Sequence, residues 1–255
     1  MRKLLGLTAF SLLLFPAASL SQENPAQANE TAEAQYVALQ ADLFDEQSLT
    51  ALPDSVNAIA RMLREIRSQF PVVESLRVPP QWTANTSLIV GFRPALRPQV
   101  DRLCAAWSGY ARARSETIGI AEMDAITRRF GGEYDITCQN RGLSLGPYVV
   151  VNFPRLYHVP SLARLYKALP AVTSAENNRL VLGGVMPVSV KKEDGQWRVT
   201  FGHGSGDCPA GCIFREYHRF LVAPDFTIQF VGTEQQGEAP IPEPPEDPQE
   251  EALPQ

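Results

Sequence analysis

Two cysteines with nearby histidines form the residue group with the most obvious chemistry. Cys208 and Cys212 are separated by three residues, and His203 and His218 lie on either side. Thiolates and imidazoles are the ligands that Cu(I) and Zn(II) prefer, so a metal site built from both cysteines and either histidine is one interpretation. The other is a disulfide, because segment 202–212 reads GHGSGDCPAGC and its glycines and proline are typical of a tight turn. We expect the disulfide, with no cofactor, and keep the metal site as the alternative.

Other residues that could do chemistry fit structural roles better. A phosphate-binding loop leads into a helix and carries a Lys-Ser/Thr pair. The glycines of segment 202–206 instead lead into a strand-like run, and no such pair follows them. Asp207 is expected to accept hydrogen bonds from backbone amides in its turn. His158 suits capping or packing at a helix start, and Asp124 and Glu133 have the pattern of solvated helix charges. An enzyme of an unrecognised type therefore stays a third hypothesis.

The strand-like runs around the loop could also carry a binding surface. They span residues 196–201 and 213–222, and they combine aromatic and polar side chains, which are common in protein interfaces. The candidate residues of this surface are Trp197, His203, Asp207, Tyr217, His218 and Phe220.

The first 21 residues have the layout of a secretory signal peptide. Two basic residues precede an apolar run over 4–15, which is too short to span a bilayer, and no later run approaches that length. We therefore expect an exported chain, secreted or periplasmic, in a compartment where its four cysteines form disulfides. Of the three pairings, spacing favours Cys208–Cys212 with Cys104–Cys138.

Charge divides the rest of the chain into three parts. Residues 22–48 hold six acids and no base, and we expect an acidic flexible linker there. Residues 235–255 hold another six acids, no base and many prolines, which predicts a disordered tail. Residues 49–234 have about five more bases than acids and suit a single domain. Nucleic acid is not an expected partner, because the chain has no dense basic stripe.

Periodicity within residues 49–234 predicts an α+β fold. The expected helices are 53–70, 98–110, 120–130 and 160–169, and the expected strands before residue 180 are 87–92, 134–138, 147–153 and 172–176. From residue 185 the pattern becomes an antiparallel β-meander with strands at 185–192, 196–201, 213–222 and 226–231. Glu193-Asp194-Gly195 is its expected hairpin turn.

Two stretches resemble known families. GDCPAGC at 206–212 with the aromatic strand up to Val222, preceded by 165–177, resembles a block in uncharacterised exported bacterial proteins. A His-Tyr-Trp triplet is common in that block, where this chain has Glu216-Tyr217-His218. More weakly, residues 149–176 are similar to propeptides and inhibitors of subtilisin-type proteases, in a strand, a helix with a Leu-Pro-x-Val turn, and a strand carrying Glu. That likeness implies a ferredoxin-like α/β sandwich, here extended by the β-meander and its disulfide-stapled loop, and a role in occupying a protease cleft.

Together these observations predict an exported, non-enzymatic protein that binds a protein or peptide through a sheet face or the stapled loop, and the second likeness makes protease inhibition one form of that binding. The alternative is a copper- or zinc-binding exported protein using Cys208, Cys212 and His203 or His218. The partner's identity and the oligomeric state do not follow from the sequence.

Overall fold

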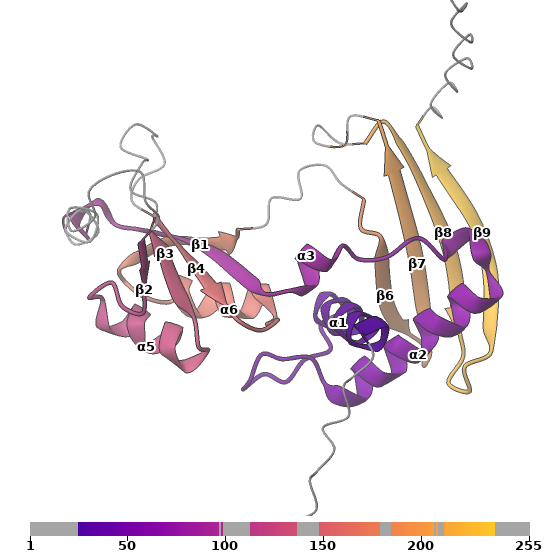
Figure 1. Ribbon diagram of the computed structural model, residues 1–255, viewed down its shortest axis with the longest axis horizontal. Helices are drawn as coiled ribbons and strands as arrows, with labels where there is room; N and C mark the ends of the chain where they lie inside the picture. The colour runs from indigo at the N-terminus through magenta and orange to yellow at the C-terminus, as the bar shows by residue number, and fades with distance from the viewer. Residues whose placement is uncertain are drawn as a thin grey trace, which may run out of the picture.

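The computed structural model describes residues 25–96, 98, 113–136, 148–178, 185–206, 208 and 212–237. They form two antiparallel sheets with helices, so the expected α+β class and the C-terminal meander are confirmed (Figure 1). The expected signal peptide, the helix at 98–110 apart from Pro98, and both Cys104 and Cys138 lie outside the described residues.

The first sheet has the strand order β2-β3-β4-β1-β5. Its strands are β1 (Thr86–Phe92), β2 (Ala113–Ser115), β3 (Glu133–Ile136), β4 (Tyr148–Phe153) and β5 (Val172–Asn177). Helices α5 (Ala121–Arg129) and α6 (Val159–Lys167) pack on one face through Met123, Leu162 and Tyr166. Alternate residues of β4 are fully buried, as expected for a strand with helices on one side.

A buried hydroxyl cluster joins these two helices to the sheet. Thr127 Oγ1 lies 2.7 Å from the hydroxyl groups of both Tyr134 and Tyr166. Burial raises the pKa of both phenols, so they stay protonated and act as hydrogen-bonding core residues.

The second sheet is a meander in the order β6-β7-β8-β9. It contains β6 (Val188–Glu193), β7 (Gln196–Ser205), β8 (Phe214–Val222) and β9 (Ile228–Gln236). The expected turn between β6 and β7 is present, with Asp194 at φ 50° and Gly195 at φ 79°. Two successive positive φ angles are what a two-residue hairpin loop needs, which explains the Asp-Gly pair.

Two N-terminal helices, α1 (Pro25–Gln40) and α2 (Pro53–Gln69), cover one face of this meander (Figure 1). Ile59, Met62 and Ile66 of α2 are fully buried against Val199, Phe201 and Phe220. The two ends of the described chain therefore build one hydrophobic core, while residues 86–177 supply most of the other.

The expectation of a flexible linker at 22–48 is wrong for residues 25–40. Residues 25–40 form α1, in which Ala34, Val37 and Ala38 are fully buried. The helix has a narrow stripe of small apolar residues, and it packs against α2 because alanine allows a close approach. The first residues of the tail expected from 235 are instead part of β9, because Gln235 and Gln236 pair with β8; residues 238–255 lie outside the described residues.

The loop between α1 and α2 connects the two cores. Leu49 is buried in the core of the five-stranded sheet, and its carbonyl accepts a hydrogen bond of 2.8 Å from the His158 amide. Phe44 stacks on the His158 ring with the centroids 3.9 Å apart. A short four-residue helix, α3 (Pro80–Thr83), lies in the segment that leads from α2 back to β1 (Figure 1).

Candidate functional site

The stapled loop contains the expected disulfide between Cys208 and Cys212. Because their sulfurs are bonded to each other, the two cysteines do not provide the thiolates that the alternative copper or zinc site requires. Among the described residues there is no group of three His, Cys, Asp or Glu side chains that could hold a metal ion.

The turn is shorter than the sequence predicts, since β7 continues to Ser205. Its glycines allow a close approach of other backbone and side-chain atoms. A Cβ atom on Gly202 would lie 2.6 Å from the Met186 carbonyl oxygen, and one on Gly204 would lie 2.5 Å from Cys212 Sγ. The glycines therefore allow close packing under the stapled loop. From the sequence alone, the same glycines indicate a tight turn.

The binding surface expected around this loop does not form a single face. Phe220 and His218 are buried on the face that α2 covers, whereas Tyr217 points to the opposite face. Trp197 is half-buried against the helix-side core, and Lys192 Nζ lies 5.2 Å from its ring centroid. His203 is exposed, and Asp207 lies outside the described residues.

His218 has structural partners in the meander. Its Nδ1 lies 3.0 Å from Thr233 Oγ1, and its Nε2 lies 3.6 Å from a carboxylate oxygen of Glu216. The contact with Thr233 joins β8 to β9, whereas Glu216 lies on β8 itself.

His158 also has a structural environment, at the start of α6. Its Nδ1 lies 2.8 Å from Ser161 Oγ, and its Nε2 lies 3.0 Å from an oxygen of Asp42. Ser161 Oγ also accepts a hydrogen bond of 2.7 Å from Arg164. Serine, histidine and carboxylate thus lie in a row, but the serine and the ring are buried, and the arrangement fastens the α1–α2 loop to α6.

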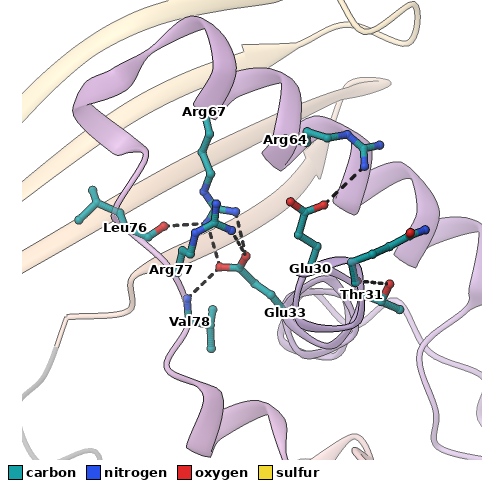
Figure 2. Close-up of polar contacts among 9 residues, drawn as sticks. Glu30, Thr31, Glu33, Arg64, Arg67, Leu76, Arg77 and Val78 are labelled. Carbon is teal, nitrogen blue, oxygen red and sulfur yellow. Dashed lines mark hydrogen bonds and ion pairs between the residues drawn. The ribbon is translucent and has the colours of Figure 1, made fainter. Parts of the chain in front are cut away.

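A buried ion pair fixes α1 on α2 (Figure 2). Arg67 donates two hydrogen bonds of 2.8 Å to the carboxylate of Glu33, and a third of 2.7 Å to the Leu76 carbonyl. The same carboxylate accepts a hydrogen bond of 2.8 Å from the Val78 amide. Every oxygen of the pair is used within the fold, so this charged group has a structural role.

The helix-free face of the five-stranded sheet is the remaining candidate site. Among the described residues no helix covers this face, which we call the open face. Cross-strand register places its side chains in rows. One row is polar and contains Glu133, Asn152, Ser87 and Asn178, and the next contains Arg114, Asp135, Val150, Ile89 and Glu176.

A depression with a volume of about 590 Å³ lies at the β2–β3–β4 side of the open face. Arg114, Glu133, Asp135 and Asn152 line it, and the half-buried Val150 lies beside them. Ser87 holds the polar row in place, since it donates a hydrogen bond of 2.8 Å to Asn152 and accepts one of 3.0 Å from Asn178.

The chemistry of the open face suits recognition. It offers one guanidinium, carboxylates and amides for hydrogen bonding, next to half-buried apolar side chains of Ile89 and Val150. A mixed apolar and hydrogen-bonding surface is typical of protein interfaces. The described residues of this face include no histidine or cysteine that could act as a general base or nucleophile.

Sequence reasoning missed this site. The alternation in YVVVNF indicates a strand with two different faces, yet only the tertiary structure shows which face the helices leave open. Asp124 and Glu133, interpreted together as solvated helix charges, separate in the structure. Glu133 lies on β3, whereas Asp124 is buried and accepts hydrogen bonds from the amides of Ile118 and Gly119.

Comparison with known proteins adds no relative. No protein-family model matches the sequence, and no curated protein or solved structure is significantly similar to it.

Among the described residues, no helix is both long enough and apolar enough to cross a membrane.

Proposed function

We propose that this protein binds a protein or peptide partner through the open face of its five-stranded sheet. The observation that carries the proposal is the one-sided sheet, which packs α5 and α6 on one face while the other presents Ile89 and Val150 beside a polar depression. Apolar residues flanked by polar ones favour a surface that another chain covers.

A protease is the partner class that the sequence likeness suggests. Within the five-stranded antiparallel sheet, β3, β4, β1 and β5 follow one another, and this order supports the ferredoxin-like arrangement that the likeness implies. The segment similar to subtilisin-type propeptides and inhibitors spans β4, α6 and β5 and lies within this sheet. These features support an inhibitor-like role for an exported chain.

An inhibition assay tests this role. The full chain should inhibit a subtilisin-type protease with a micromolar or lower constant, on the order of 8 kcal/mol of binding free energy. Ile89→Asp with Val150→Asp should weaken inhibition at least about tenfold, since it places charges in the centre of the interface. Leu221→Asp, on the helix-free side of the other sheet, is the matched control and should inhibit like the wild type. A protease that keeps full activity with excess wild-type protein would contradict the inhibitor-like role.

A further inference from the structure

The meander has its own helix-free side, opposite α1 and α2, which we call the outer face (Figure 1). Cross-strand register places four basic side chains on it, namely Lys191, Arg198, Arg215 and Arg219. They lie on the opposite side from Val190, Val199 and Phe220, which are buried under the helices.

The acids on the outer face do not balance these bases. Two of the bases share Glu193. Lys191 Nζ lies 2.6 Å from Glu193 Oε1, and Arg198 Nη2 lies 3.0 Å from Glu193 Oε2. Arg219 pairs with Glu234. Arg215 forms no ion pair among the described residues, and its Nε atom is buried without a hydrogen-bond partner. A buried donor without a partner is costly, so an acceptor at this position would be favourable.

A segment of the same chain has the complementary charge. Residues 238–255 follow β9 directly and contain six acids, six prolines and no base. The last described residue, Gly237, lies against the backbone of Ile213, two residues before Arg215. The acidic segment therefore begins beside the basic residue that lacks an acceptor.

The length of this segment fits the path of the bases. Arg215 and Arg219 lie on β8, Arg198 on β7 and Lys191 on β6, so the four bases form a diagonal across the sheet. With a rise of about 3.3 Å per residue and about 4.8 Å between strands, the diagonal is roughly 22 Å long. A proline-rich chain extends about 3.1 Å per residue, so seven or so residues span the diagonal and 18 residues reach about 55 Å.

We infer that the acidic tail, residues 238–255, binds back across the outer face and shields its basic side chains, with an acceptor for Arg215 at the start of the path. This contact is separate from the open face of the other sheet. The contact gives a role to the acidic tail and the basic outer face, because the bound tail would keep other anionic molecules off the meander.

A labelled peptide with the sequence of residues 238–255 tests the inference on the full chain. The wild type is compared with a tail-neutral variant, in which the six tail acids are replaced by Gln or Asn. The tethered tail has an effective concentration of about millimolar, so the wild type should bind the free peptide at least about tenfold more weakly than the tail-neutral variant. Binding should also weaken as salt increases.

Two further variants locate the contact. In the tail-neutral background, Lys191→Gln, Arg198→Gln, Arg215→Gln and Arg219→Gln together should reduce peptide binding at least about tenfold. The matched control replaces four exposed arginines elsewhere, Arg61, Arg64, Arg128 and Arg129, by Gln and should bind within about twofold of its parent. A double variant, Lys191→Gln with Arg198→Gln, replaces the test if the fourfold variant does not fold. Both side chains are exposed, and peptide binding should fall by a smaller factor than in the fourfold variant.

Three results would overturn the inference. They are equal peptide binding by the wild type and the tail-neutral variant, the absence of binding by both, and a loss in the control as large as in the outer-face variant.

Discussion

At the level of single residues, the buried pair formed by Glu33 and Arg67 joins α1 to α2. Both side chains are about 5% exposed, so neither charge is solvated by bulk water. The bidentate geometry and the hydrogen bonds to Leu76 and Val78 offset much of the lost solvation, while Arg67 Nε is buried without a hydrogen-bond partner. The exposed Arg77 approaches the same carboxylate at 3.8 Å and adds positive charge to the site.

Removing one partner of this pair should destabilise the protein strongly. Glu33→Gln leaves Arg67 buried without its counter-charge, and we expect the free energy of unfolding to fall by about 3 kcal/mol or more in chemical denaturation. Glu30→Gln is the matched control, because Glu30 and Arg64 form an exposed pair on the same two helices, and it should cost less than about 1 kcal/mol. Similar losses in both variants would show that Glu33 contributes little beyond a surface charge.

His158 should make stability depend on pH. Burial lowers the pKa of its imidazole, as does Arg164, while Asp42 partly offsets this by raising the pKa. The unfolded state then binds a proton more readily, so the contribution of His158 is complete above about pH 6.5 and is lost as the pH falls towards the lower folded-state pKa. The free energy of unfolding, measured between pH 5 and 8, should decrease as the pH is lowered. His158→Gln should make the free energy of unfolding depend less on pH. An unchanged slope in the variant would assign the acid sensitivity to other groups.

At the scale of elements, β7 and the stapled loop depend on atoms that are distant in sequence. Val185 and Met186, which precede β6, lie against Gly202, and Cys212 lies against Gly204. The strand therefore continues through a glycine run that strand propensity alone disfavours. The same contacts explain why residues 202–205 belong to the sheet although the sequence predicts a turn.

Adding a methyl group to this strand should disturb the loop. Gly204→Ala should lower the free energy of unfolding by about 1–3 kcal/mol, because its Cβ would overlap Cys212 Sγ. In a background of Cys208→Ser with Cys212→Ser the cost should be smaller, since the unbridged loop can move away. Thr200→Ala, on the same strand, is the control and should change stability by less than about 0.5 kcal/mol. Additive costs in the double-mutant cycle would mean that Gly204 and the disulfide do not interact.

At the scale of the whole molecule, the first and last elements of the described chain depend on each other. The flexible linker expected at 22–48 is instead a helix over residues 25–40, because α1 supplies buried residues of the meander core. Deleting residues 22–41 would remove Ala34, Val37 and Ala38 from the meander core and Glu33 from Arg67.

This deletion should abolish cooperative unfolding of the meander core. Burial of apolar area at about 25 cal/mol per Å² makes the lost helix worth several kcal/mol, a large part of the stability of a domain. Limited proteolysis of the wild type should leave α1 attached. A deletion variant that melts cooperatively near the wild-type temperature would contradict this role of α1.

Much of the fold follows from local sequence patterns. Helix α2 and strands β1 and β4 appear within one or two residues of the predicted bounds, because strong periodicity and flanking prolines mark them. The weak apolar stripe of α1 could not reveal a helix that a distant sheet and a buried arginine stabilise. The open face could not be predicted either, since alternation gives two faces of a strand but not the face that helices cover.

Recognition through the open face, on which the proposed function rests, can be measured by selecting binding peptides from a random library with the full chain as bait. We expect an enriched sequence motif whose peptides bind the wild type and lose at least about tenfold affinity for Ile89→Asp with Val150→Asp. Thr200→Asp with Leu221→Asp, on the outer face of the other sheet, should keep the wild-type affinity. Peptides that bind the open-face variant as tightly as the wild type, or a selection without any enriched motif, would contradict the claim.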